Sequence, residues 1–299
     1  MAAIDTAFRQ SYQNDFEVKF QQMGSRLRST VSERPQNVDR AMYDRIGTVN
    51  VTKKTIRHGP TVLNDADHSR IAVLIDDWRP DALAFDNEEK LRMALGDPRN
   101  GYAQTQAMAL GRQLDAVIIS AATGTTFTGR NGTGTEAYVA ATYGIAVDAV
   151  APGGVAANSN LTIEKLIQAK AKFGTQESVM DGEELTFVWT QSQMNSLLRT
   201  TEVTSADFNT VRALVNGQID SFMGFKFVRT ELLAKASNIR TCIAYPRSGI
   251  LLGMADDKTV RMDERADLNY TWQVWTQGTF GAARTWLEKV VSVACDESV

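Results

Sequence analysis

The feature that most constrains the fold of this chain is one long apolar stretch with helical periodicity. Between Ala103 and Ala121, apolar residues recur at every third or fourth position. Asp97 followed by Pro98 is typical of a helix start, and Gly124 can end the helix. A helix of about 26 residues at 1.5 Å per residue is roughly 39 Å long.

This predicted helix carries very little charge. Between residues 100 and 123, only Arg112 and Asp115 are charged. A helix with so few charges must be covered on most of its circumference, which one small domain cannot easily do. The stretch therefore favours a subunit whose neighbours cover the helix. The alternative is the central helix of an ordinary α+β core.

Composition excludes some functions. The hydrophobic fraction is 43%, enough for a sizeable core, the net charge is −3 and the pI is near 5.6. A duplex-binding protein normally carries a basic surface, so tight neutralisation of phosphates is not expected. Residues 1–60 are the exception, with ten Lys and Arg against six Asp and Glu.

Neither the cysteines nor the histidines form a pattern typical of a metal site. Cys242 and Cys295 lie far apart and outside any CxxC pair, which fits a reducing compartment better than a disulfide framework. His58 and His68 are ten residues apart on an expected loop, whereas ligands on one helix face are three or four apart. We expect no bound metal. A site shared with an aspartate of the same loop is the less favoured alternative.

No pattern indicates catalysis or a cofactor. Residues 132–137 match the GxGxxA form of the dinucleotide fingerprint, but they follow a loop and not a strand. The sequence contains no GxSxG motif, and neither cysteine has a histidine nearby. We therefore expect no enzyme activity and no cofactor.

Targeting signals are also not expected. Residues 1–5 lack a basic region followed by an apolar run, and no stretch approaches the roughly 18–20 apolar residues of a membrane helix. The expectation is a protein made in the cytoplasm that does not contact a membrane.

The first 80 residues predict elements that need a partner surface. Aromatic residues four positions apart between Phe8 and Phe20 favour a short amphipathic helix within 7–28. Strands are predicted at 46–56 and 70–75, joined by a polar tip at 57–69. An isolated two-stranded hairpin is marginal in water, so we expect another copy of the chain to support it.

The remainder predicts a mixed α+β body. We expect a flexible connector at 124–134 and helices at 163–173 (capped by Thr162), 192–199 and 207–215. Strands are expected at 185–189, 225–228 and 241–245. Segments 270–276 and 289–295 alternate like two paired strands, with a turn around Gly278 to Gly281.

Several strings, taken in order, give the chain its resemblance to a known family. They are Gln22–Arg28, Tyr43–Gly47, His68–Arg70, Asp97–Pro98 with Tyr102–Ala103, Gly111–Arg112, Gly224–Phe225 and Gly281–Arg284. No single string is specific, but in this order and spacing they resemble the major capsid proteins of tailed bacteriophages over nearly the whole chain.

The resemblance implies the Hong Kong 97-type capsid fold, an α+β fold. Its parts would be an N-terminal arm (1–40), an extended β-hairpin loop (41–80), a peripheral domain with a long spine helix (81–147 and 269–299) and an axial domain (148–268).

The resemblance also implies partners. Copies would assemble in the host bacterial cytoplasm into pentamers and hexamers of an icosahedral virion shell. That shell would enclose double-stranded DNA without sequence-specific binding. Portal, scaffolding and decoration proteins are further expected partners. Some relatives form a lysine–asparagine cross-link, but no acceptor or catalytic acid is evident here for Lys53 or Lys54.

The hairpin tip supplies the candidate site, a set of intersubunit contacts and not a catalytic centre. The candidate contacts are Arg57, His58, Asp65, His68 and Arg70, at the tip and at the start of the following strand. Two alternatives remain: an encapsulin-like nanocompartment shell, which shares the fold but encloses protein cargo, and a soluble α+β enzyme with a dispersed site.

Overall fold

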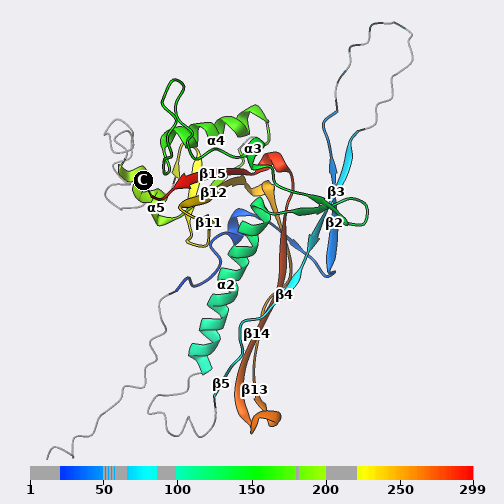
Figure 1. Ribbon diagram of the computed structural model, residues 1–299. Coiled ribbons are helices and arrows are strands. Elements are labelled where there is room, and N and C mark those ends of the chain that lie inside the picture. Colours follow the sequence, from blue (N-terminus) through cyan, green and yellow to red (C-terminus); the bar gives the residue numbers. More distant parts are fainter. Residues whose placement is uncertain are drawn as a thin grey trace, which may run out of the picture. The chain divides into compact units, whose positions relative to one another are not determined.

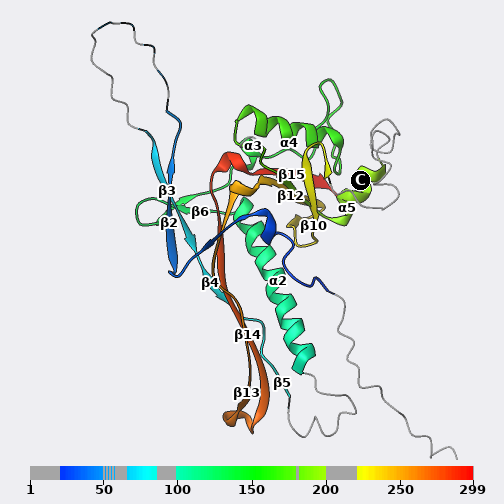
Figure 2. The same ribbon diagram turned by 180° about the vertical axis from the view of Figure 1, so that it is seen from behind.

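The computed structural model describes residues 21–49, 51, 53, 55, 57, 66–85, 99–179, 182–199 and 221–298. Figures 1 and 2 show its ribbon from two sides. Helices and sheets are both present, which confirms the predicted α+β class. The helices are η2 (Arg28–Thr30), α2 (Arg99–Thr123), α3 (Ala140–Tyr143), α4 (Ile163–Thr175), α5 (Gln191–Arg199), η3 (Arg247–Gly249), η4 (Ala266–Leu268) and η5 (Leu287–Lys289).

Within the described residues, the strands form three sheets. They are β1 (Ser32–Pro35), β2 (Arg40–Ile46), β3 (His68–Leu74), β4 (Asp76–Trp78), β5 (Leu83–Phe85), β6 (Thr126–Thr128), β7 (Gly134–Glu136), β8 (Leu185–Trp189), β9 (Ser221–Phe222), β10 (Phe225–Arg229), β11 (Lys235–Ala236), β12 (Ile239–Pro246), β13 (Ile250–Arg265), β14 (Thr271–Arg284) and β15 (Val291–Asp296).

Two compact units divide the chain. Unit 1 comprises Met1–Ser25, Asp77–Leu114 and Asp256–Thr279, and unit 2 comprises Arg26–Asp76, Asp115–Ala255 and Phe280–Val299. In unit 1, the side chain of Gln106 on α2 is buried. Its Nε2 donates to the carbonyl of Val274, and its Oε1 accepts from the hydroxyl of Thr276. These bonds fix α2 to β14.

The largest sheet of unit 2 has the order β11-β12-β8-β10-β9, with β15 paired to β12. β8 and β10 are parallel, so that Phe187 lies beside Phe227, with ring centroids 5.4 Å apart. Trp189 stacks on Phe227 at 4.2 Å. The predicted strands at 185–189, 225–228 and 241–245 are confirmed.

The helix α4 also agrees with the prediction. The hydroxyl of Thr162 accepts a hydrogen bond from the backbone N–H of Lys165, as expected of an N-cap. Lys165 is fully buried, and its Nζ donates to the carbonyls of Val147, Ser159 and Ala294 at 2.7–2.9 Å. This ammonium joins α4 to β15 and to the 147–159 segment. Helix α5 confirms the predicted helix at 192–199, whereas the predicted helices near Phe8–Phe20 and at 207–215 lie outside the described residues.

The predicted hairpin is present, but its first strand was misplaced. β2 pairs antiparallel with β3 from Arg40–Leu74 to Ile46–His68, so the strand ends where the prediction began it. The predicted connector at 124–134 is also wrong, since β6 and β7 extend this sheet in the order β2-β3-β6-β7. The threonine-rich composition of 124–134 was a strand signal that its glycines obscured.

The predicted pairing of the last two strands is wrong. β15 pairs with β12, and β14 runs without a turn through Gly278 and Gly281. β14 lies instead in the sheet of order β1-β13-β14-β4, to which β5 is also paired. A Cβ on Gly281 would lie 1.8 Å from the carbonyl oxygen of Leu74, so this glycine permits a close backbone approach and does not mark a turn.

Helix α2 confirms the strongest prediction. At the C-terminal end of this helix, the charged side chain of Arg284 binds several carbonyl groups. Arg284 is 1% exposed, and its guanidinium donates to the carbonyls of Ala122 (2.8 Å), Gly124 (3.0 Å) and Glu136 (3.3 Å). The guanidinium also lies 5.3 Å from the ring centroid of Tyr138. Burial lowers the pKa of Arg284, while Glu136 opposes the shift.

The two charged residues inside α2 hold the N-terminal arm. In unit 2, the buried carboxylate of Asp115 accepts the backbone N–H groups of Arg26 and Leu27, all at 3.1 Å. In unit 1, Arg112 donates to the side chain of Gln21. Next to it, a Cβ on Gly111 would lie only 2.8 Å from backbone atoms of Gly24.

We predict that Gly111→Ala destabilises the protein, although alanine normally favours a helix interior by up to about 1 kcal/mol. The new methyl group must displace the backbone of Gly24, which costs about 1–3 kcal/mol of unfolding free energy. Denaturant unfolding should report this loss, and tryptic cleavage after Arg26 and Arg28 should become faster.

The control is Gly174→Ala in α4, where a Cβ meets nothing within 4 Å. It should raise the free energy of unfolding by up to about 1 kcal/mol, because alanine favours a helix interior over glycine, and it should leave tryptic cleavage of the arm at the wild-type rate. Equal behaviour of the two variants would show that the arm does not rest on Gly111.

Candidate assembly site

The structure places two of the five predicted contact residues on one strand. His68 and Arg70 are both on β3, and Arg57 is exposed. His58 and Asp65 lie outside the described residues. The assignment of all five as intersubunit contacts remains a prediction.

The base of the hairpin, residues 44–48 and 67–70, is called the hairpin root. Asp44 and Arg70 face each other across the β2–β3 ladder, and Arg70 Nε lies 2.5 Å from Asp44 Oδ1. The hydrogen bond from Arg70 lowers the pKa of Asp44, helped by the charges of Arg70 and His68 and opposed by desolvation. The same hydrogen bond raises the pKa of Arg70. Cross-strand pairs of this type fix the register of a hairpin.

Arg45 anchors the hairpin root to the body of unit 2. Only 8% exposed, it donates to Ser69 Oγ (3.0 Å), to the carbonyl of Thr285 (2.7 Å) and to Glu136 Oε2 (3.2 Å). Its guanidinium lies 4.6 Å from the ring centroid of Trp286. A planar guanidinium suits this combination of several acceptors and an aromatic face. The root is therefore held firmly.

A hollow of about 790 Å³ lies at the hairpin root, lined also by residues 128–130 and Glu136. Its charges are largely paired within the chain, because Asp44 binds Arg70 and Glu136 binds Arg45. Such a hollow offers few unsatisfied groups to a ligand.

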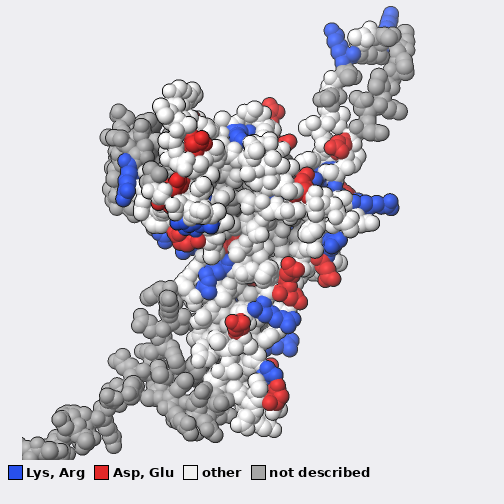
Figure 3. Space-filling model, viewed as in Figure 1, with Lys and Arg blue, Asp and Glu red and all other residues white. Residues whose placement is uncertain are grey.

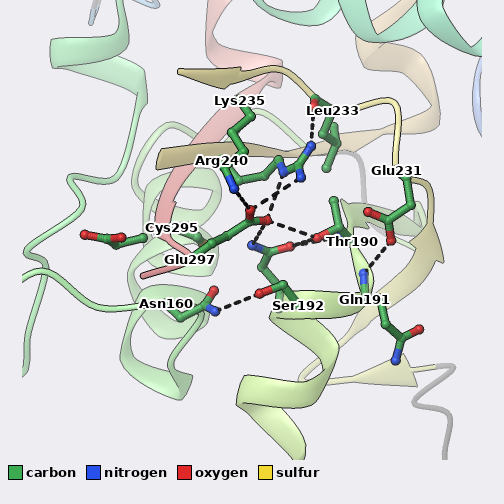
Figure 4. Close-up of polar contacts among 12 residues, drawn as sticks. Asn160, Thr190, Gln191, Ser192, Glu231, Leu233, Lys235, Arg240, Cys295 and Glu297 are labelled. Atoms are coloured by element: carbon green, nitrogen blue, oxygen red, sulfur yellow. Dashed lines mark hydrogen bonds and ion pairs between the residues drawn. The ribbon is translucent and has the colours of Figure 1, made fainter. Parts of the chain in front are cut away.

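Away from the hairpin, a cluster of charged residues surrounds Glu297 (Figure 4). Its side chain is 9% exposed and binds Lys235 Nζ (2.6 Å) and Arg240 Nε (2.9 Å). Gln193 Nε2 donates to Glu297 Oε1 at 3.2 Å, and the hydroxyl of Thr190 donates to the amide oxygen of Gln193. The cluster joins the end of the chain to β11, β12 and α5.

The electrostatics of Glu297 suit an anchor and not a proton-transfer group. Burial alone would raise its pKa, but hydrogen bonds from Arg240, Lys235 and Gln193 outweigh burial and lower the pKa to about 2. The carboxylate therefore stays ionised at neutral pH, with its oxygens occupied by these donors.

The hydroxyl of Ser248 lies between a carboxylate and an ammonium group, a combination that can also occur around a catalytic nucleophile. Its Oγ donates to Glu183 Oε2 at 3.0 Å and accepts from Lys289 Nζ at 2.8 Å. Glu183 also accepts the backbone N–H of Ser248. The carboxylate of Glu183 thus binds both the hydroxyl and the backbone N–H of Ser248, which indicates a role in holding the 247–249 turn in place. Among the described residues, no group of three His, Cys, Asp or Glu side chains could hold a metal ion, and no helix could span a membrane.

Neither Arg45, which fixes the hairpin root, nor Glu297 was predicted as a functional residue. For Asp115 a signal was present, because a lone carboxylate inside an apolar helix needs a polar partner. Arg45 and Glu297 have no such local signal, since their partners lie far away along the chain.

Comparisons with known proteins agree with this geometry. A family model described as "Phage capsid protein" matches residues 4–297. No curated protein matches significantly. Among solved structures, the chain is similar to a chain of Mycobacterium phage Che8, with TM-score 0.70 and 12% identity over 96% of this chain and 97% of that one.

Two further structures give the same result. The capsid of the cyanophage P-SCSP1u has TM-score 0.70 and 13% identity over 97% of this chain and 93% of that one. The capsid of a native GTA particle has TM-score 0.70 and 12% identity over 99% and 97%. At these identities the likeness concerns the fold, and it confirms the predicted Hong Kong 97-type capsid fold.

The cluster around Glu297 generates a pH prediction. A carboxyl whose folded pKa is about 2, against an ordinary 4.5, stabilises the fold fully above pH 4.5 and loses that effect as pH falls toward 2. Glu297→Gln should lower the free energy of unfolding by about 3 kcal/mol at pH 7. The deficit relative to the wild type should shrink between pH 4.5 and pH 2, as measured by urea unfolding.

The control is Asp267→Asn, which removes the exposed ion pair between Asp267 and Arg265. That variant should not differ measurably from the wild type, because water and salt screen such pairs. A deficit for Glu297→Gln that is the same at pH 7 and pH 2.5 would show that packing and not charge causes it.

Proposed function

This chain belongs to the phage capsid protein family, and on that premise we propose that its copies form the pentamers and hexamers of an icosahedral head enclosing double-stranded DNA. The chain itself is a capsid protein, a structural subunit of the virion shell. The proposal further assigns assembly to the host bacterial cytoplasm, with portal, scaffolding and decoration proteins as partners and without catalytic activity.

The observation that carries the proposal is the hairpin. Its root is fixed by Arg45, yet beyond the root Val49 is 63% exposed and Val51 is 98% exposed. Apolar side chains this exposed are stabilised by a neighbouring surface. We propose that the neighbour is another capsid subunit. We also propose that the arm, loop, peripheral and axial regions have the boundaries given above.

The charge balance of the chain supports enclosure of DNA without tight or sequence-specific binding. A net charge of −3 opposes tight binding, and the basic excess of residues 1–60 is available for non-specific contact with phosphates. Nanomolar, sequence-selective duplex binding at physiological salt would contradict this assignment.

The purified protein should exist as capsomers or closed shells. Sedimentation velocity and electron microscopy at micromolar concentration measure this directly. A single species near the monomer mass of 32.9 kDa would overturn the proposal. Shells that contain a protein cargo and no DNA when isolated from their host would instead indicate a nanocompartment.

Shortening the hairpin should separate assembly from folding. Replacing residues 49–65 by an Asn-Gly turn retains the bond between Gly47 N–H and the carbonyl of Asp67 and all of the β2–β3 ladder. We expect an unchanged unfolding transition but no closed shells, only isolated capsomers or irregular aggregates.

The control is an equally long loop of Gly and Ser in place of residues 49–65. It should also fail to close shells if side chains of the hairpin make the contact. Regular shells from either variant would show that the hairpin is not the intersubunit contact.

A further inference from the structure

A second hollow adjoins the hairpin root and differs from the first in its charge. Its volume is about 520 Å³, and it is lined by residues 46–48 and 67 of the root, by residues 176–179 after α4, and by residues 286, 288 and 289. All of these belong to unit 2. It is called the acid hollow below.

The charges of the acid hollow are not balanced within the chain. It contains the carboxylates of Asp67, Glu177 and Glu288 against one ammonium, that of Lys289. Lys289 is bonded to Ser248 Oγ. The three carboxylates are exposed and form no ion pair within the described part of the chain. This contrasts with the first hollow, whose carboxylates bind arginines.

Glu177 occupies a position that is unfavourable for it in two respects. It has φ +47° and stands just after the C-cap of α4, where its N–H bonds the carbonyl of Gly174 and that of Ser178 bonds the carbonyl of Phe173. Glycine is the preferred residue at this left-handed position. A carboxylate at a helix C-terminus is also repelled by the helix dipole. The isolated chain therefore gains nothing from this carboxylate, which points to an interaction outside it.

Two further groups in the acid hollow have unused hydrogen-bonding capacity. Gln176 Oε1 and Ser178 Oγ are buried atoms with no hydrogen-bond partner in the described part of the chain. Buried polar atoms normally find a partner, and an incoming N–H donor would supply one. Beside them, Ile46, Val179 and Trp286 give the hollow an apolar wall. A suitable ligand thus combines cationic donors with apolar groups.

One segment of this chain has that combination. Between Arg45 and Asp65 the sequence contains Lys53, Lys54 and Arg57 but no Asp or Glu. Of this segment, Val49, Val51, Lys53 and Arg57 are described as exposed, and basic side chains stand out on the outer part of the hairpin in Figure 3. Residues 49–57 are called the basic limb.

The basic limb of the same chain does not fill the acid hollow. Val51 is 98% exposed in the single chain, and Thr48, directly before the limb, already forms part of the hollow's edge. If the proposed function holds, a second copy of the chain can supply this segment.

We propose that the acid hollow of one subunit receives the basic limb of a neighbouring subunit's hairpin. This inference rests on the proposed function and adds the receiving surface to it. Lysine or arginine side chains of the limb bind the carboxylates of Glu177 and Glu288, and the limb's valines pack on the apolar wall. Complementary charges of this kind set the register of an interface and the rate of encounter.

Charge reversal tests the pairing. The hollow variant carries Glu177→Lys and Glu288→Lys, the limb variant carries Lys53→Glu and Arg57→Glu, and a combined variant carries all four. Each of the first two should raise the protein concentration needed for shell formation by roughly ten-fold or more, because like charges then face each other. The combined variant should restore assembly toward the wild-type level.

A matched control carries Asp148→Lys and Asp263→Lys, which reverse two exposed carboxylates outside the hollow. It should assemble like the wild type. Normal assembly by the hollow variant, or failure of the combined variant to recover, would overturn the inference. If the wild type itself forms no shells or capsomers, the proposed function fails and not merely the pairing.

Glu177→Gly separates a binding role from a structural one. Glycine relieves the left-handed backbone and removes the charge opposed by the helix dipole, so the unfolding midpoint of the unassembled protein should rise by about 1–3 °C. Shell formation should nevertheless weaken. A variant that is both more stable and equally able to assemble would show that Glu177 does not contact a neighbour.

Discussion

The buried guanidinium of Arg284 is the interaction on which most of unit 2 depends. The last carbonyls of a helix have no partner within the helix, and burying them unpaired is costly. Arg284 satisfies the carbonyls of Ala122 and Gly124 while its charge complements the helix dipole. It also bonds the carbonyl of Glu136 and covers Tyr138, whose hydroxyl accepts the N–H of Ser292. One side chain thereby fixes α2, β7, β14 and β15 together.

Charged groups in this protein follow two different rules. Those that are buried or nearly so are bonded within the chain: Arg45, Asp115, Lys165, Arg284 and Glu297 each bind several partners, although Nε of Arg284 has none in the described part of the chain. Removing one partner from such a group leaves an uncompensated buried charge. Alternative arrangements of the surrounding segments are therefore unfavourable. The carboxylates of the acid hollow are exposed and unpaired. A shell subunit needs both kinds of charge, because its own fold must be fixed before its surface can select neighbours.

The hairpin combines the two rules in one element. A two-stranded ribbon alone is marginal in water. Here β6 and β7 widen its inner part to four strands, and Arg45 and the Asp44–Arg70 pair hold the register of the root. Beyond the root, Val51 is almost fully exposed. The inner part is therefore stable in the single chain, whereas the outer part, on our proposal, gains its stabilisation from contacts between subunits.

The sequence by itself determined the elements whose signals are local. The periodicity of α2, the Thr162 cap of α4 and the strand at 185–189 were predicted because helix and strand periods and caps depend on residues a few positions apart. Likewise, the order of short strings was enough to predict the capsid fold. Tertiary structure decided which strands pair, since a period of two tells which side chains share a face but not which strand lies alongside. It alone placed β15 beside β12, buried Lys165 and set Glu177 in a left-handed turn. For the candidate site, His68 and Arg70 were predictable as charges at a hairpin. The role of Arg45 and the acid hollow depend on contacts between distant segments, such as Arg45 with Thr285 and residues 46–48 with 176–179.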